Sequence, residues 1–543
     1  MTHNTIGSWM GSSRGPSWGI CLLFALIYWG PEMMLRDLWE PDEARFAYVA
    51  DEMMQEGHLL VPHRNSEGYA HKPPLQFWLN QGFANMTGGE INRVTTRLPS
   101  VVASATTLYV TSRLALLLYG GFAGWFAPLL LASSFIFWKT TGMGQMDALL
   151  LGLQSGAMGL LIFSEGRSRN RQLLMWVGAY LLMGLAILTK GPVGFLIPYG
   201  SWICFTAARG QVTQFRKGHL LWGPLLALLL PAMWLGAMLL WEPPPPGFLD
   251  ELLFKQNLGR VDGSFARGHI RPFWYFLKYL PVDFMPWTLL MPAAVVTLIK
   301  DKPSRSSSKA LLGWLTFVVL FFSLPATKRN LYILSAYPAL AILLAGAWER
   351  RKRLHQTPEH IFSGFLLLLG LVMMSAGPLQ PWLPHDIPLN LWLLFPSGLL
   401  FGVCSILLWM QKESQRWLTT AIAGVSIGLV TFSALIYPAM NPVKVPYALA
   451  AAAKEHPPSQ PELLLYRMHG EIQALNAKLR GHEISTPEEL DHILEQGGHH
   501  LMVIKSEHWH DIQDLPQLDQ ATWEDYSMGS KTLRWVAFDL AVP

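Results

Sequence analysis

Residues 166–192 read GRSRNRQLLMWVGAYLLMGLAILTKGP, a basic segment followed by an apolar block and a short turn. An uninterrupted apolar block of about 18 residues is long enough to cross a bilayer as a helix. Such blocks recur along the whole chain and predict about thirteen transmembrane helices, and therefore an α-helical polytopic membrane protein. The predicted spans are 17–35, 94–118, 121–138, 147–165, 172–189, 192–208, 219–241, 284–299, 310–325, 331–348, 361–378, 390–410 and 418–437.

The loops between these blocks alternate in charge, which predicts the orientation of the chain. With the N-terminus inside, every second loop faces the cytoplasm and is rich in Lys and Arg, as the positive-inside rule requires. These loops are GRSRNR (166–171), ARGQVTQFRKG (208–218), KDKPSRSSSK (300–309), ERRKRLH (349–355) and QKESQR (411–416). The opposite loops, richer in Trp, Pro and Tyr, are 36–93, 139–146, 242–283, 326–330 and 379–389. In a bacterium the spans would lie in the inner (plasma) membrane, and these outer loops in the periplasm.

The composition agrees with this class of protein. Charged residues make up 14% of the 543 residues and apolar residues 51%, whereas soluble domains contain about 25% charged residues. Because the basic residues mark the topology, the net charge of +4 does not indicate a nucleic-acid partner. Cys21, Cys204 and Cys404 all lie inside predicted spans, so we expect neither a disulfide framework nor a metal–thiolate site.

The composition changes near Pro442, so we expect a transmembrane domain with outer loops, 1–442, and a small α/β periplasmic domain, 443–543. Short apolar runs at 463–466, 501–504 and 533–538 supply its core. Thr486, followed by Pro487 and then Glu489, predicts the start of a helix. The histidines of this segment lack cysteine or ordered acidic partners, which favours a solvated surface over a metal site. They are His499, His500, His508 and His510.

The first outer loop begins with LWEPDEARFA (38–47), directly after the first span. Residues 44–55 are amphipathic, and we expect them to form a helix lying in the membrane interface. Asp42 would then lie near the N-terminus of that helix, where backbone N–H groups favour a carboxylate. From the residues alone, Asp42 could either cap the helix or act in catalysis, because the two kinds of carboxylate look alike in a sequence.

Cationic side chains gather in the other outer loops and at the outer ends of spans. Ionisable residues such as Asp147 and Lys190 are costly at that depth and usually functional, although each could instead form a structural ion pair or extend toward the interface. Arg and Lys are the residues that hold phosphate, and at a membrane boundary the expected phosphate belongs to a lipid. The cluster comprises Lys72, Lys190, Arg260, Arg267, His269, Arg271, Lys328 and Arg329, with Tyr332 as a hydroxyl donor.

Seven short motifs in this order carry a resemblance to a known family. They are LWEPDEARFA (38–47), YAHKPP (69–74), RLPS (97–100), MDAL (146–149), TKGP (189–192), HIRPFWYF (269–276) and KRNLYIL (328–334). The chain resembles the GT-C membrane glycosyltransferases of the protein-mannosyltransferase superfamily, and most of all the 4-amino-4-deoxy-L-arabinose (aminoarabinose) transferases that modify lipid A. The resemblance covers nearly the whole chain, including the C-terminal periplasmic domain.

The resemblance implies a glycosyltransferase that uses a polyprenyl-phosphate-linked sugar and inverts the anomeric carbon. The implied donor is aminoarabinose on undecaprenyl phosphate, and the implied acceptor is lipid A. Asp42 and Asp147 would be catalytic, and Glu43, Tyr69, Lys328 and Arg329 could contact substrate. The residues implied to bind the donor phosphate are Lys72, Lys190, Arg260, Arg267, Arg271 and Tyr332.

One position departs from the aminoarabinose pattern, since His71 stands where those enzymes usually have Glu. His71 could share a divalent metal with His269, or it could keep a neutral hydrogen-bonding role. No other cofactor is implied.

Two other functions remain compatible with the sequence. An enzyme of the same superfamily could glycosylate a protein or another envelope lipid, because the acceptor is selected by the shape of a pocket. A lipid or sugar transporter would also have many spans, but it should show paired halves and charges near the middle of the bilayer. Here the charges lie at one edge.

Overall fold

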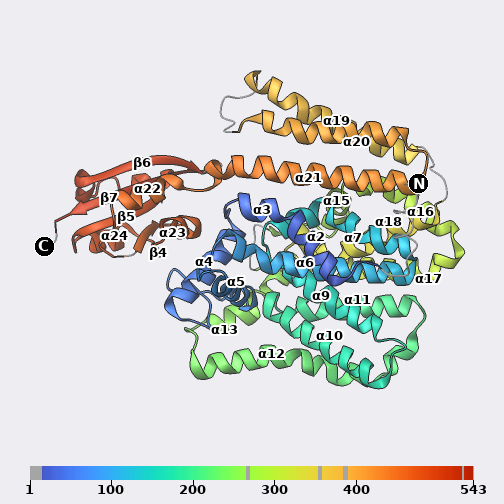
Figure 1. The fold of residues 1–543 in the computed structure, drawn as a ribbon. Helices are drawn as coiled ribbons and strands as arrows, with labels where there is room; N and C mark the ends of the chain where they lie inside the picture. The colour runs from blue at the N-terminus through green and yellow to red at the C-terminus, as the bar shows by residue number, and fades with distance from the viewer. Residues whose placement is uncertain are drawn as a thin grey trace.

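The computed structural model describes residues 15–264, 269–351, 357–382, 389–460, 462–528 and 531–541. Long helices run side by side, and a β-rich domain formed by the C-terminal part of the chain lies at one end of them (Figure 1). Within the described residues, nine helices are long and apolar enough to cross a membrane, four of them together with an adjoining short helical turn. They contain α6 (Arg93–Leu118), α9 (Met146–Phe163), α10 (Arg169–Lys190), α12 (His219–Trp241), α17 (Arg305–Ser323), α18 (Tyr337–Arg350), α19 (Thr357–Leu379), α20 (Phe395–Met410) and α21 (Ser414–Lys444).

The remaining predicted spans are bent or short. α7 (Gly121–Ala132) meets α8 (Phe135–Gly142) at 64°, and α15 (Tyr275–Asp283) meets Trp287–Lys300, which contains α16 (Met291–Lys300), at 97°. α2 (Trp18–Tyr28) and α11 (Val193–Ala208) are shorter apolar helices. The fold class is confirmed, but the described chain has nine to eleven candidate spans rather than about thirteen. With each bent pair counted as one span the number is eleven, and the short helices α2 and α11 account for the other two predicted spans.

The predicted first span ends in a separate short helix, α3 (Gly30–Leu35). The first outer loop then folds into α4 (Asp42–Glu56), a hairpin of β1 (His63–Arg64) and β2 (Glu67–Gly68), and α5 (Leu75–Met86). α4 is amphipathic, as its sequence predicts. Its apolar face is buried in a protein core shared with α5 and the C-terminal domain, and its expected position in the membrane interface stays a prediction. The pattern shows only that one face must be covered, and here protein covers it.

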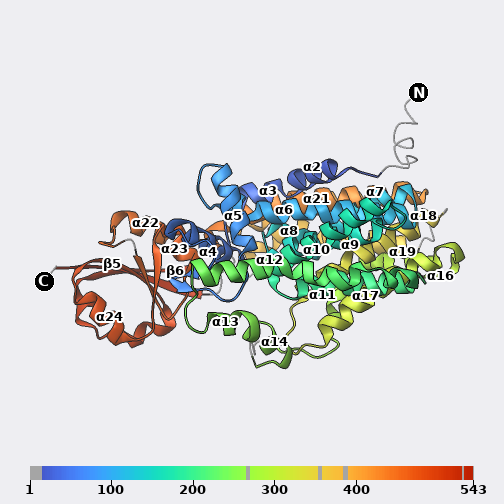
Figure 2. The same cartoon turned by 90° about the horizontal axis from the view of Figure 1, so that it is seen from below.

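The C-terminal domain begins with α22 (Tyr447–Glu455) and is built on a five-stranded sheet in the order β4-β3-β5-β7-β6 (Figure 2). β3 is parallel to β4 and β5, whereas β7 is antiparallel to β5 and β6. The predicted helix start is confirmed, since the side-chain oxygen of Thr486 accepts a hydrogen bond from the Glu489 amide at 3.3 Å. The elements are β3 (Glu462–Tyr466), α23 (Glu471–Ala477), β4 (Arg480–Ile484), α24 (Pro487–Leu494), β5 (Gly498–Lys505), β6 (Ala521–Met528) and β7 (Lys531–Leu540).

The two faces of this sheet are covered differently. α24 packs on one face, in a core that belongs to the C-terminal domain alone. On the other face lie α23 and the outer-loop helices α4 and α5, which share one core with the sheet. Polar contacts reinforce the junction, because the Tyr48 hydroxyl accepts a hydrogen bond from the Gly481 amide at 2.8 Å and the Asn65 amide donates to the His469 carbonyl at 3.0 Å. The C-terminal domain is therefore joined to the first outer loop by both apolar and polar contacts.

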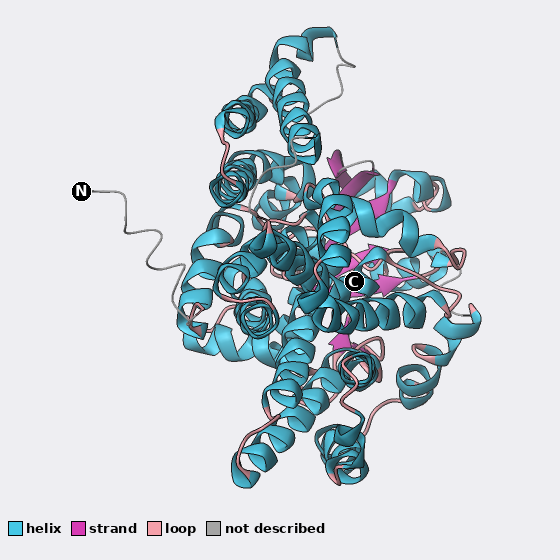
Figure 3. Ribbon diagram, turned by 90° about the vertical axis from the view of Figure 1, so that its right-hand side faces the viewer, coloured by secondary structure: helices cyan, strands magenta, loops and turns pink. Residues whose placement is uncertain are grey.

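Loops predicted to face the cytoplasm meet at the opposite end of the helices, which faces the viewer in Figure 3. Glu165, after α9, pairs with Arg209, after α11, at 3.5 Å. Asp301, after α16, pairs with Arg350 at the end of α18, also at 3.5 Å. The predicted inner loops thus share one end of the molecule, and the C-terminal domain lies at the other.

Candidate active site

A cavity of about 370 Å³ lies at the end of the helices that carries the C-terminal domain. Its wall is formed by the start of α4, the turn before α5, the facing ends of α9, α10 and α11, α14 (Leu258–Asp262) and η6 (Asn330–Ala336). We call it the donor cavity. Its polar lining comprises Asp42, Arg45, Tyr69, His71, Lys72, Asp147, Gln154, Lys190, Gln256, Asn257, Thr327, Arg329, Tyr332 and Ser335.

Asp42 is the first residue of α4, one position after the N-cap residue, Pro41. Its carboxylate accepts a hydrogen bond from Arg329 at 2.9 Å, and Arg45 lies one helical turn further along at 3.8 Å. Burial alone would raise the pKa of Asp42, but Arg329, Arg45 and Lys190 outweigh this and hold the pKa below its ordinary value. Asp42 is therefore not the N-cap residue of α4. It is an ionised carboxylate that lines the donor cavity.

Asp147 and Lys190 form an ion pair in the wall of the donor cavity. The Lys190 ammonium donates to the Asp147 carboxylate at 2.5 Å and lies 5.3 Å from the centre of the Tyr332 ring. Lys190 ends α10 and Asp147 is in the first turn of α9, so each charge lies at the helix end whose dipole favours it. An ion pair thus forms, but it forms in the cavity wall, where an entering phosphate can reach Lys190.

The turn before α5 brings Tyr69, His71 and Lys72 to the same cavity. The His71 ring lies 2.9 Å from the Glu251 carboxylate, and its centre is 4.8 Å from that of the Tyr69 ring, with the two ring planes tilted by 43°. Glu251 belongs to the long outer loop 242–283, so His71 ties that loop to the turn that carries Lys72.

The rest of the donor cavity is apolar. Three of its apolar side chains are strongly exposed: Leu196 on α11 by 42%, and Leu258 and Val261 on α14 by 61% and 54%. Exposed Leu and Val on a transmembrane protein are compatible with lipid, because lipid chains are as apolar as these side chains. The cavity therefore combines a cationic centre with an apolar side, as a site for a phosphate on a lipid chain requires. Its apolar lining also includes Leu150, Leu151, Val193, Phe321, Phe322, Leu331 and Leu334.

Several predicted site residues lie elsewhere. Glu43 is 2% exposed and is bound by Arg36 and Arg97, so it belongs to a buried ion network and does not line the cavity. Lys328 is likewise buried, and its ammonium donates to the carbonyls of Pro325 and Arg271. In both places the neighbouring residue, Asp42 or Arg329, is the one that faces the cavity.

The remaining predicted cations are less well placed. The Arg271 side chain is exposed and donates to the carbonyl of Ile270 at 2.8 Å. Arg260 belongs to α14, whose residues Leu258 and Val261 line the cavity, but its side chain lies outside the described residues. Arg267 also falls outside the described ranges. A phosphate contact by Arg260 or Arg267 stays a prediction.

Sequence reasoning missed Arg45 as a site residue, together with Gln154 and Asn257. Arg45 follows Asp42 by three positions on α4, a spacing that places two side chains on one face of a helix. That signal was present in the sequence. The two amides carry no such signal, because their position depends on how α9 and α14 meet.

The described residues bring together one group of three side chains suited to a metal ion, His58, His63 and Glu242. It lies between the loop after α4 and the end of α12. Neither His71 nor His269 belongs to it. His269 is exposed, and its carbonyl accepts a hydrogen bond from the Lys328 amide at 2.9 Å.

Comparison with known proteins agrees with the family resemblance. Residues 71–235 match the family of dolichyl-phosphate-mannose-protein mannosyltransferases. A relative from Serratia proteamaculans is 27% identical over 74% of this chain and 73% of its own length. Another, from Edwardsiella ictaluri, is 28% identical over 80% and 79%, and both are named undecaprenyl phosphate-alpha-4-amino-4-deoxy-L-arabinose arabinosyl transferase.

The fold has a solved counterpart. The crystal structure of ArnT from Cupriavidus metallidurans bound to undecaprenyl phosphate superposes with a TM-score of 0.76 and covers 96% of this chain and 97% of that one, at 18% identity. The membrane domain, outer loops and C-terminal domain of the present chain thus follow one known architecture. The chain is therefore a multi-pass membrane glycosyltransferase that is similar to the dolichyl-phosphate-mannose-protein mannosyltransferases over residues 71–235 and to the aminoarabinose transferases over most of its length.

Proposed function

We propose that the chain transfers 4-amino-4-deoxy-L-arabinose from undecaprenyl phosphate to a phosphate of lipid A. The observation that carries the proposal is the donor cavity, in which an ionised carboxylate faces a cationic centre beside an apolar wall. The names of the relatives give the sugar and its carrier. A solved relative of the same fold holds undecaprenyl phosphate.

The donor phosphate is held by Lys72 and Lys190, with the Tyr332 hydroxyl beside them. All three line the donor cavity, and Lys190 is already adjacent to the Tyr332 ring. Charge develops on this phosphate as the bond to the anomeric carbon breaks, and fixed cations at that place lower the barrier. The undecaprenyl chain extends past the exposed apolar residues Leu196, Leu258 and Val261.

The low pKa of Asp42 favours an acceptor that is already ionised. A carboxylate bound to Arg329 is a weak base, since proton transfer is most efficient when the pKa of the base lies near the working pH. A phosphate acceptor needs little deprotonation, so Asp42 orients Arg329 and Arg45, and these guanidinium groups hold the acceptor phosphate.

The reaction is then one displacement. An oxygen of the lipid A phosphate attacks the anomeric carbon and forms the new bond, and the bond from that carbon to the donor phosphate breaks. Undecaprenyl phosphate leaves with the electron pair, and the configuration of the anomeric carbon is inverted.

The reaction takes place at the periplasmic face of the bacterial inner membrane. The support is the clustering of basic loops at the end of the helices opposite the donor cavity, because Lys and Arg are enriched in cytoplasmic loops.

Mass spectrometry of lipid A tests the proposal. Cells that express this chain should contain lipid A heavier by one aminopentose, and cells that lack the chain or express Asp42→Asn should not. Unchanged lipid A together with a new glycosylated protein or envelope lipid would refute lipid A as the acceptor.

A further inference from the structure

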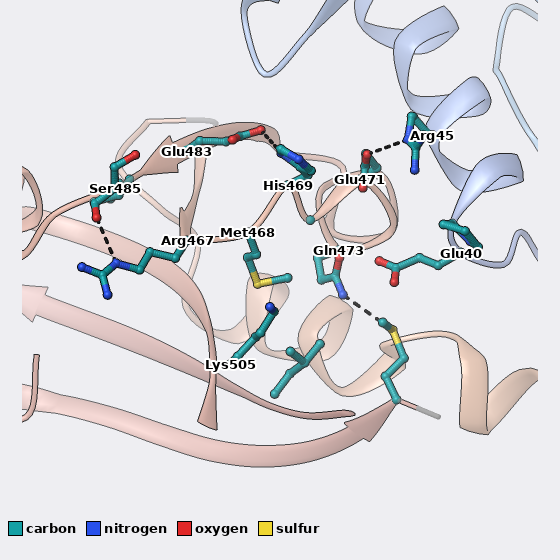
Figure 4. Close-up of a pocket in the computed structure, with 15 residues that line it drawn as sticks. Glu40, Arg45, Arg467, Met468, His469, Glu471, Gln473, Glu483, Ser485 and Lys505 are labelled. Carbon is teal, nitrogen blue, oxygen red and sulfur yellow. Dashed lines mark hydrogen bonds and ion pairs between the residues drawn. The ribbon is translucent and has the colours of Figure 1, made fainter. Parts of the chain in front are cut away.

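A second cavity, of about 380 Å³, lies between the C-terminal domain and the start of α4 (Figure 4). One wall comes from the segments that follow β3 and β4 and from the end of β5, including Arg467, Ser485 and Lys505. The facing wall is formed by Glu40, Pro41 and Arg45. We call it the switch-point cavity.

The topology of the sheet creates this opening. β3, β4 and β5 are parallel in the order β4-β3-β5. The chain therefore runs from β3 to β4 on one side of it, and then crosses over to β5 on the other side. α23 and α24 consequently cover opposite faces of the sheet. In open α/β sheets, ligands bind in the crevice beyond the carboxyl ends of the strands at such a reversal. The residues that follow β3 and β4 and the last residue of β5 line the switch-point cavity.

The switch-point cavity and the donor cavity share one side chain, since Arg45 lines both of them. Its guanidinium lies 3.8 Å from the Asp42 carboxylate on one side and 3.1 Å from the Glu471 carboxylate on the other. A single molecule can therefore place one group beside Asp42 and another inside the C-terminal domain.

Two of the carboxylates of the switch-point cavity are already engaged. Glu471 is paired with Arg45 at 3.1 Å and Arg64 at 3.6 Å. Glu483 accepts hydrogen bonds from Asn65 at 2.5 Å and lies 2.8 Å from His469. These two carboxylates bind the C-terminal domain to the first outer loop. Because their negative charge is already compensated there, they repel an anionic ligand of the cavity only weakly.

Lys505 is the cation best placed for a ligand. It projects into the middle of the cavity between Met468 and Gln473 (Figure 4). Its ammonium lies 3.3 Å from Glu507, whose side chain is 65% exposed. Exposed ion pairs of this kind contribute little, so an anion that enters the cavity can replace Glu507. Gln473 is fully buried, and its amide donates to the thioether of Met528 at 3.6 Å, which is a weak acceptor.

We propose that the switch-point cavity binds the distal, phosphate-bearing saccharide of the acceptor glycolipid while the phosphate at its near end receives the sugar beside Asp42. The proposal rests on the function proposed above. Lys505 binds the distal phosphate, and Gln473 and Glu40 offer hydrogen bonds to saccharide hydroxyl and amide groups. The volume lies within the range of about 300–1,000 Å³ that small-molecule sites occupy.

The test is a kinetic comparison on the full-length protein with purified lipid A carrying two phosphates. Lys505→Ala should raise the KM for lipid A by about tenfold or more, the effect of losing a charged hydrogen bond. The kcat and the binding of undecaprenyl phosphate should be unchanged, because the lost interaction is the same in the ground state and the transition state. Lys505→Arg should keep the KM near that of the parent. Lys478→Ala is the matched control, since it removes an 82% exposed lysine from the same domain outside the cavity.

Lipid A with a single phosphate separates the possible outcomes. With this acceptor the parent should show the raised KM, and Lys505→Ala should add nothing further. An unchanged KM in Lys505→Ala with the two-phosphate acceptor, or a loss confined to kcat, would overturn the proposal while leaving the proposed function intact. If the parent transfers no sugar to either acceptor, the proposed function itself fails.

Discussion

Replacing Asp42 by Asn and Glu43 by Gln should give opposite results, although the two acids are neighbours in the first turn of α4. Each change removes one negative charge and keeps nearly the same shape. Asp42 is half-buried in the wall of the donor cavity and is bound by Arg329, whose side chain is 39% exposed. Glu43 is buried between Arg36 and Arg97, which are both fully buried.

The surroundings set the magnitudes. A partly exposed pair such as Asp42–Arg329 contributes about 0–1 kcal/mol to folding, so Asp42→Asn should leave the melting temperature nearly unchanged. If Asp42 orients the groups that hold the reacting phosphate, its loss should cost about 3 kcal/mol in the transition state, roughly a hundredfold or more in rate. Breaking a fully buried pair costs about 3–5 kcal/mol of folding free energy, so Glu43→Gln should lower the melting temperature by several degrees.

The assay is transfer by purified variants in detergent, with melting temperature and undecaprenyl phosphate binding measured on the same samples. Asp42→Asn should melt and bind like the parent but transfer very slowly. Glu43→Gln should melt early and transfer in proportion to its folded fraction. Near-normal transfer by Asp42→Asn would refute the role given to Asp42, and a normal melting temperature in Glu43→Gln would refute the account of the buried network.

Three further predictions concern the donor phosphate, the sides of the membrane and pH. Lys190→Ala should weaken undecaprenyl phosphate binding about tenfold or more, whereas Lys412→Ala, in a predicted cytoplasmic loop, should not; equal binding by the two variants would place the phosphate elsewhere. In intact spheroplasts a membrane-impermeant thiol reagent should label Glu507→Cys but not Lys412→Cys, and the reverse pattern would invert the topology. Burial and Glu90 raise the pKa of Asp51 to about 6, above its unfolded value of about 4, so the folded protein loses stability as the pH rises from about 4 to 6. Asp51→Asn should therefore raise the melting temperature at pH 8 and lose that advantage near pH 4, and an equal effect at both pH values would contradict the raised pKa.

The transmembrane helices could be predicted because hydropathy is a local property of the chain. Each apolar block corresponds to helical structure, including those that form the bent pairs α7–α8 and α15–α16. The helix at Thr486 was predictable for the same reason, since its cap is formed by residues three positions apart. Bends and neighbours depend on packing between distant segments, and no local pattern records them.

The candidate site shows the same limit at the level of single residues. Asp42, Lys72, Lys190 and Tyr332 come from four different motifs. All four line one cavity, as the family resemblance implies. The sequence did not separate Asp42 from Glu43, because successive helical residues point about 100° apart and only the tertiary fold shows which direction is the cavity. The same holds for Lys328 and Arg329, since only Arg329 lines the cavity.

The position of the C-terminal domain links the end of the chain to its beginning. The amide of Asn441, near the end of α21, accepts hydrogen bonds from the Asp37 amide at 3.0 Å and the Trp39 indole at 3.1 Å, and donates to the Leu35 carbonyl at 3.0 Å. The last span therefore holds the segment that leads into α4, and the C-terminal sheet buries the apolar face of that helix. Asp42 is the first residue of α4, so its position depends on contacts made by residues some four hundred positions later. A domain attached only by a flexible linker could move without disturbing the donor cavity. The C-terminal domain instead shares a core with the helix that carries Asp42, so displacing the domain would also move the Asp42 carboxylate.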